Sequence, residues 1–125
     1  MDVAHVALWV SDLETSKAFY EDALGLRHEK DFVGPDGATN YFVRGETDAL
    51  LQFKHDPDAS VEVASGGLAH VALAVDDVDE AFDRAVERGG AGVRRAPETI
   101  DDLAVRNAFV EDPDGYVLEL EQDLS

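Results

Sequence analysis

An internal repeat constrains what this chain can fold into more than any other feature of its sequence. The segment His5–Val10 reads HVALWV and His70–Val75 reads HVALAV, 65 positions later, so five of six residues are identical. A second pair of segments, Leu50–Phe53 and Val117–Leu120, lies 67 positions apart. Repetition at a nearly fixed spacing indicates that one structural unit occurs twice. We therefore expect two copies of the same small fold along the chain.

Both repeats show the same order of local signals. After the first strand, Ser11–Glu14 has the form of a capping box, and Asp76–Glu80 offers acidic helix caps at matching places. Gly25 and Gly89–Gly90 then suit the left-handed position just past a helix end. Short β-like segments follow in both halves. Each repeat is therefore predicted to be a βαβββ module, which makes the fold class α+β.

Turn and linker signals mark the boundaries. His55–Ser60 and Ser65–Gly67 carry linker chemistry between the repeats, and Asp112–Gly115 predicts a tight turn before the last strand. We predict one domain over residues 1–125, in which the two repeats cover about 1–55 and 68–125.

Composition and charge exclude several classes of function. The chain carries 28 acidic against 10 basic residues, a net charge of −18, which repels nucleic acids and anionic membranes. The acids are spread along the chain and 45% of the residues are hydrophobic, which predicts a folded, halophilic protein. Cysteine is absent, so a metal must be held by imidazole, amide or carboxylate groups. Because no leader or membrane-spanning run is evident, we expect a cytoplasmic protein.

Four polar residues are predicted to share one face of the sheets. Side chains alternate along a strand, so the two repeat histidines lie opposite the apolar residues that cover the helices. One strand histidine, amide or carboxylate alone is most often a solvated side chain. Here the four residues occupy the first and last strands of both repeats, where a pseudo-twofold axis would bring them together. We therefore predict a metal site formed by His5, Gln52, His70 and Glu119.

Several segments together resemble the vicinal-oxygen-chelate superfamily, which contains glyoxalase I, methylmalonyl-CoA epimerase, extradiol dioxygenases and antibiotic-resistance (bleomycin-type) binding proteins. The segments that carry the resemblance are His5–Leu8, Phe19–Tyr20, Leu24–Leu26, Gly67–Val71, Val75–Asp77, Ala108–Tyr116 and Leu118–Leu120. Ala108–Tyr116 is particularly similar to the end of bacterial glyoxalase I. The resemblance implies two βαβββ modules in an open eight-stranded cup around one divalent metal (Ni, Co, Zn, Mn or Fe), with the same four ligands. It also implies a small-molecule substrate and a homodimer.

The resemblance further implies a reaction. In glyoxalase I a hemithioacetal is isomerised to a thioester, with the metal acting as a Lewis acid. Glu119 is then the expected catalytic residue, carrying a proton between neighbouring carbon atoms. Trp9 and Arg106 are candidate substrate-binding residues, although an aromatic residue is often simple packing and an Arg in so acidic a chain is ordinarily paired with an acid. His28 has no partner in the other repeat and is expected at the surface, as is His55.

Three alternatives remain open at this level. Gln52 stands where bacterial glyoxalase I usually has Glu and matches the ligand set of methylmalonyl-CoA epimerase, whereas Ala69 precedes His70 where epimerases tend to have a second histidine. Two histidines and one carboxylate would also suit the Fe(II) of an extradiol dioxygenase. The third alternative is a metal-free binding protein. Trp9 and Asp56 replace residues typical of glutathione-dependent enzymes, which favours another low-molecular-weight thiol.

Overall fold

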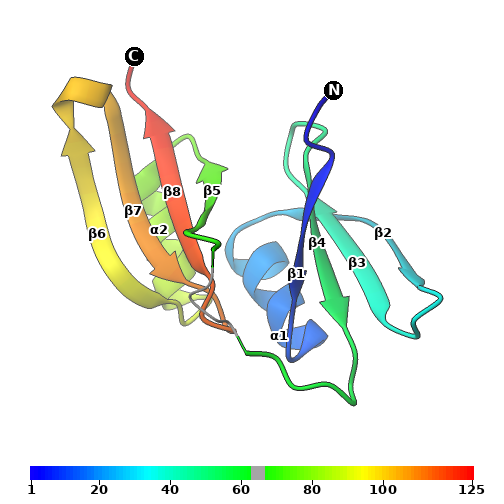
Figure 1. Cartoon of the computed structure of the whole chain (residues 1–125). Helices are drawn as coiled ribbons and strands as arrows, with labels where there is room; N and C mark the ends of the chain where they lie inside the picture. The colour runs from blue at the N-terminus through cyan, green and yellow to red at the C-terminus, as the bar shows by residue number, and fades with distance from the viewer. Residues whose placement is uncertain (63–66) are drawn as a thin grey trace. The chain divides into compact units, whose positions relative to one another are not determined.

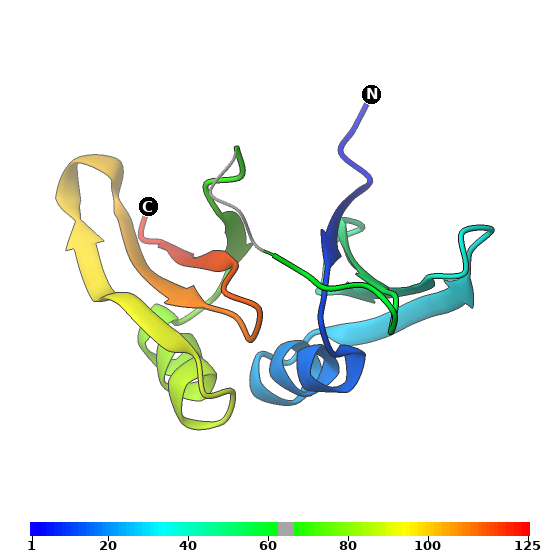
Figure 2. The ribbon, with the colours of Figure 1, turned by 60° about the horizontal axis from the view of Figure 1, so that its bottom comes forward.

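The computed structural model describes residues 1–62 and 67–125, and each of these two ranges forms a compact unit. Each unit is a four-stranded sheet with its helical segment packed on one side, as Figures 1 and 2 show. The element order in each is βαβββ, so the predicted fold class and module are confirmed. The predicted linker at Ser65–Gly67 lies mostly outside the described residues, and the grouping of both repeats into one domain stays a prediction. No helix in the described ranges is long and apolar enough to cross a membrane.

The first unit is built from four strands and one helical segment. Its elements are β1 (His5–Trp9), α1 (Leu13–Lys17), the π-helical turn η1 (Ala18–Ala23), β2 (Arg27–Val33), β3 (Thr39–Arg44) and β4 (Leu50–His55). The strand order is β1-β4-β3-β2; β1 and β4 run parallel, and the other neighbours are antiparallel.

The second unit repeats this topology. Its elements are β5 (Val71–Ala74), α2 (Val78–Glu87), β6 (Gly92–Ile100), the 3-10 turn η2 (Asp101–Leu103), β7 (Val105–Glu111) and β8 (Val117–Asp123). The strand order β5-β8-β7-β6 is the equivalent one, again with a parallel pair formed by the first and last strands. The first strand is shorter than predicted, so His70 lies just before it.

Equivalent aspartates begin the two helices. The Asp12 side chain accepts a hydrogen bond from the Thr15 backbone N–H at 3.1 Å, and Asp77 accepts one from Glu80 at 3.1 Å. The N-cap predicted at Ser11 is therefore displaced by one residue, to Asp12. Asp12 is preferred because its carboxylate also complements the positive end of the helix dipole. The first helical segment ends as predicted at Gly25, where φ is +83°.

Alternation along the strands sets the core of each unit. Leu8 and Val10 are buried as predicted, but Val6 on the same side of β1 stays 37% exposed. In the last strands, Phe53, Leu118 and Leu120 are completely buried. Their intervening neighbours therefore project from the opposite side of the sheets, away from the helices.

The predicted turn at Asp112–Gly115 is present between β7 and β8. The buried Asp112 side chain accepts hydrogen bonds from the backbone N–H groups of Asp114 and Tyr116, both at 2.9 Å. Gly115 has φ of +93°, a conformation that costs little only for glycine. This turn fixes the register of the hairpin that carries Glu119.

Candidate metal and substrate site

Strand register gives the two candidate ligands of the last strands equivalent positions. Gln52 on β4 lies between Ala7 of β1 and Phe42 of β3. Glu119 on β8 lies between Ala72 of β5 and Phe109 of β7. The repeat inferred from sequence is thus reproduced strand by strand.

Each candidate histidine packs against the phenylalanine next to the last-strand ligand. His5 meets the Phe42 ring edge to face with centroids 5.5 Å apart, and His70 meets Phe109 at the same distance. A cation covers each phenylalanine: Lys30 Nζ lies 4.8 Å from the Phe42 centroid, and the Arg95 guanidinium carbon lies 5.2 Å from that of Phe109. In each unit, therefore, the phenylalanine paired with the candidate ligand of the last strand also contacts the candidate histidine.

In the second unit, a histidine and a carboxylate face each other. His70 Nε2 lies 3.1 Å from Glu119 Oε1, with side chains 36% and 13% exposed. The other carboxylate oxygen, Oε2, accepts a hydrogen bond from Asn107 Nδ2 at 2.9 Å. An imidazole nitrogen and a carboxylate oxygen at this separation are suitable neighbouring donors for one metal ion.

The first unit offers a histidine and an amide. Gln52 is 7% exposed, and its Nε2 donates to Asn40 Oδ1 at 2.8 Å. Within residues 1–62 and 67–125, this is the one hydrogen bond recorded for the Gln52 side chain. Its Oε1 is therefore a candidate donor to an ion or a substrate.

The donor chemistry of these residues fits a divalent first-row metal. Imidazole, amide and carboxylate donors suit several such ions. The part of the chain that the structure describes contains no group of three His, Cys, Asp or Glu side chains gathered as a metal site. Each unit by itself supplies two of the four predicted donors: His5 and Gln52 in the first, His70 and Glu119 in the second.

Trp9 lies on the ligand-bearing face of the first sheet and is 43% exposed. Lys54, its partner across the strands, places Nζ 5.2 Å from the Trp9 ring centroid. Phe32, 48% exposed, stacks on Phe42 with centroids 6.0 Å apart. This face therefore presents aromatic rings together with lysine side chains.

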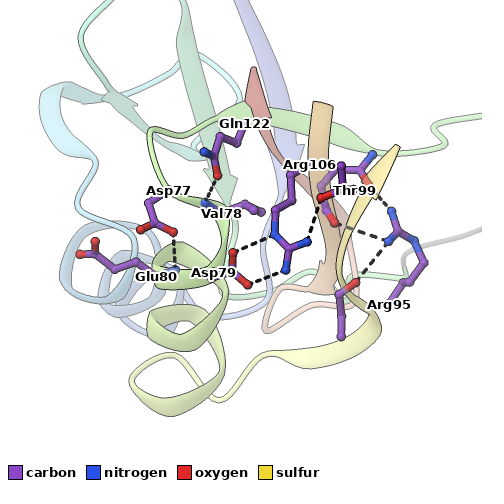
Figure 3. A network of polar contacts seen from close by, with 10 residues as sticks. Asp77, Val78, Asp79, Glu80, Arg95, Thr99, Arg106 and Gln122 are labelled. Carbon is purple, nitrogen blue, oxygen red and sulfur yellow. Dashed lines mark hydrogen bonds and ion pairs between the residues drawn. The ribbon is translucent and has the colours of Figure 1, made fainter. Parts of the chain in front are cut away.

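Arg106 lies on the other side of its sheet from Asn107, its neighbour in the strand. Its guanidinium donates two hydrogen bonds to Asp79 of α2, at 2.8 and 2.9 Å, and one to Thr99 at 3.0 Å (Figure 3). These hydrogen bonds hold the pKa of the Asp79 carboxyl below its usual range. Arg106 thus ties α2 to β7 through an acidic partner, as its acidic setting suggested. The predicted contact of Arg106 with substrate stays a prediction, and Arg106 is not part of the proposed site.

The two histidines outside the ligand set occupy unrelated places. His28 is exposed as predicted, with Nε2 2.7 Å from Asp31 Oδ2 and its ring against Tyr41. His55 is the last residue of β4 and is only partly exposed.

The sequence interpretation missed the asparagines that hold the last-strand ligands. Asn40 and Asn107 are 3% and 9% exposed and lie 67 positions apart, the same spacing as Gln52 and Glu119. That shared offset was a usable signal, but asparagine is uncommon in strand interiors and is ordinarily taken as a turn residue. Phe42 and Phe109 have the same spacing and were missed for the same reason.

Comparisons with known proteins identify the family of the chain. The family model described as Glyoxalase/Bleomycin resistance protein/Dioxygenase superfamily matches residues 2–120, and the chain belongs to that superfamily. Among its relatives, a lactoylglutathione lyase of Neisseria meningitidis is 37% identical, covering 100% of this chain and 93% of its own length. The lactoylglutathione lyase of Salmonella typhimurium is 32% identical, covering 96% and 91%.

Solved structures show the same fold. Glyoxalase I from Zea mays matches with a TM-score of 0.84 and 23% identity over 98% of this chain, which spans only 47% of the maize chain. TnmS3, an antibiotic binding protein from Streptomyces sp. CB03234, matches with a TM-score of 0.76 and 30% identity over 98% of this chain and 96% of its own. The glyoxalase-like fold is therefore confirmed.

Proposed function

We propose that this chain is a divalent-metal-dependent lyase/isomerase of the glyoxalase type, acting on the adduct of a 2-oxoaldehyde and a thiol. The observation that carries the proposal is the His70–Glu119 pair, whose facing nitrogen and oxygen lie 3.1 Å apart. Support also comes from relatives named lactoylglutathione lyase, 37% identical along the whole chain.

The proposed metal ligands are His5, Gln52, His70 and Glu119, two from each unit, and the ion is one of Ni, Co, Zn, Mn or Fe. When bound, the ion supplies a Lewis acid that polarises two neighbouring substrate oxygens. The aromatic contacts of both histidines and the hydrogen bonds of the other two residues orient the four side chains for this task. We also propose that the chain functions as a homodimer in the cytoplasm.

Glu119 is the proposed proton carrier. Its carboxylate accepts the proton from the carbon that bears sulfur and returns it to the neighbouring carbonyl carbon. The hydroxyl proton passes from one substrate oxygen to the other, so the thioester forms without an oxidant or reductant. The low exposure of the Glu119 side chain, 13%, limits exchange of the carried proton with water.

The aromatic face of the first unit is the proposed substrate surface. Trp9, Phe32 and Phe42 offer apolar contact, and Lys30 and Lys54, two of the three lysines in the chain, bring positive charge to it. Lys54 also lies 3.4 Å from the Asp36 carboxylate. In a protein with a net charge of −18, the charge of Lys30 on this face therefore favours a thiol carrier with an anionic group. The predicted substrate contact of Trp9 is kept in this proposal.

Elemental analysis of protein purified in molar KCl tests the proposal. We expect about one divalent metal per chain in the wild type, as one shared four-donor site requires, and loss of it in folded His70→Ala and Glu119→Ala variants. His28→Ala, which removes a histidine outside the site, should retain the metal. Thioester formation from methylglyoxal and candidate thiols is then assayed directly. A folded wild type that neither holds nor rebinds any of the five metals would overturn the proposal.

The same experiment separates the other candidates. The 30% identity with TnmS3 favours small-molecule binding without chemistry, which predicts ligand binding by metal-free protein. Gln52 favours an epimerase-type reaction, which predicts turnover of acyl-CoA epimers in place of thiol adducts. Retained Fe(II) with cleavage of a catechol ring would indicate a dioxygenase.

A further inference from the structure

A buried asparagine accompanies the last-strand ligand in each unit. Asn40 on β3 contacts Gln52, and Asn107 on β7 contacts Glu119. A buried polar side chain is costly unless its hydrogen bonds are satisfied, so an amide in the middle of a strand needs specific partners. Both asparagines have such partners on two sides, and these determine which way each amide points.

In the first unit, a backbone carbonyl fixes the direction. Asn40 Nδ2 donates to Ala38 O at 3.1 Å, and because a carbonyl can only accept, the Asn40 nitrogen must face it. Asn40 Oδ1 therefore faces Gln52 and accepts from Nε2 at 2.8 Å. With its nitrogen held in this way, Gln52 presents Oε1, the atom of an amide that binds metal ions.

In the second unit, a guanidinium fixes the opposite direction. Arg95 donates to Asn107 Oδ1, and because a guanidinium can only donate, the Asn107 nitrogen must face away from it. Asn107 Nδ2 donates to Glu119 Oε2 at 2.9 Å, which leaves Oε1 facing His70. Asparagine at equivalent positions thus accepts a hydrogen bond from the Gln52 amide in one unit and donates one to the Glu119 carboxylate in the other.

We propose that Asn40 and Asn107 are positioning residues that determine which oxygen each ligand presents, Oε1 of Gln52 and Oε1 of Glu119. This inference rests on the proposed function for its metal and on the two hydrogen-bond chains for its geometry. It also accounts for glutamine at position 52: a carboxylate there would meet Asn40 Oδ1, an acceptor, unless Asn40 turned and lost its bond to Ala38.

The test uses the full chain in molar KCl and compares Asn40→Leu and Asn107→Leu with the wild type. Leucine keeps the approximate shape of asparagine and removes both hydrogen bonds. The control is Glu98→Gln, which alters another side-chain contact of Arg95, 3.0 Å away, and removes neither hydrogen bond of the Asn107 side chain. If either leucine variant fails to fold, Asn40→Val or Asn107→Val, smaller and suited to a strand, takes its place.

The first readout needs no metal. In the ¹H–¹⁵N spectrum of the metal-free wild type, the Gln52 side-chain amide should be shifted and protected from exchange. In folded Asn40→Leu it should move to the position of a free amide, while the backbone signals outside the site stay in place. An unchanged Gln52 amide signal would overturn the positioning role of Asn40 whether or not the protein binds metal.

The second readout is Co²⁺ affinity measured by calorimetry. Loss of a group that orients a metal ligand typically weakens binding about 10- to 100-fold, and we expect this in both leucine variants but not in Glu98→Gln. Wild-type affinity in either folded variant would refute the role of that asparagine. If the wild type binds none of Ni²⁺, Co²⁺, Zn²⁺, Mn²⁺ and Fe²⁺, the proposed function fails, and the role of Asn107 toward a metal ligand fails with it. The amide signal then decides whether Asn40 orients Gln52.

Discussion

Replacing Asp112 by alanine tests how firmly the β7–β8 hairpin is held. The Asp112 side chain is 5% exposed and accepts two backbone hydrogen bonds, from Asp114 and Tyr116, both at 2.9 Å. Hydrogen bonds to a charged group contribute about 1.5–3 kcal/mol each, and two that share one acceptor are not fully additive. We therefore expect Asp112→Ala to lower the free energy of unfolding by about 3 kcal/mol, which lowers Tm by about 10 °C in a chain of this size.

Urea unfolding in molar KCl, followed by circular dichroism, measures this loss. The matched control is Asp56→Ala, because the Asp56 side chain accepts a backbone hydrogen bond from Asp58, at 2.9 Å, in an exposed turn. That variant should lose less than about 1 kcal/mol. Asp112→Asn keeps the acceptor oxygen and should fall between the two. Equal losses in both alanine variants, with unchanged m-values, would refute the reasoning from burial.

Three further predictions concern charge. Because the net charge of −18 repels itself, Tm should rise from dilute buffer to molar KCl, and a Tm that does not depend on salt would contradict this. Burial and the hydrogen bond to Glu21 raise the pKa of the Tyr41 hydroxyl in the folded state. The unfolded state therefore loses the hydroxyl proton at a lower pH, and the free energy of unfolding should fall as pH rises above about 10. Urea unfolding of Tyr41→Phe should show a shallower fall. The Arg106 hydrogen bonds lower the pKa of Asp79, a stabilising effect present above the ordinary Asp pKa and lost as pH falls through the lowered value. In Arg106→Ala, carboxyl NMR should find the Asp79 pKa back near its ordinary value, and no change would exclude this cause.

The repeat predicted most of the fold because it carries two kinds of information. The identical segments at His5 and His70 mark the first strands, and the alternation of apolar residues assigns their faces. Helix caps were harder, because Ser11 and Asp12 both suit an N-cap. The repeat-equivalent Asp77 would have favoured Asp12, since both aspartates cap a helix in the structure.

The surroundings of the candidate ligands were not accessible from local pattern. The contacts of Asn107 with Arg95 and Glu119 join three different strands, so they depend on sheet register, which no short segment encodes. Arg106 shows the converse. Its acidic setting already suggested a carboxylate partner, although the pattern could not show that the partner lies 27 positions away on α2.

The parallel pairing of first and last strands in each unit has a consequence for synthesis of the protein. β1 emerges from the ribosome long before β4, so it has no partner in its sheet until residues 50–55 are available, and β5 waits in the same way for β8. In both units, the strand that arrives last carries the oxygen donor, Gln52 or Glu119. Each pair of candidate ligands is therefore assembled by the final pairing step of its unit, so a partly made unit still lacks its second candidate ligand.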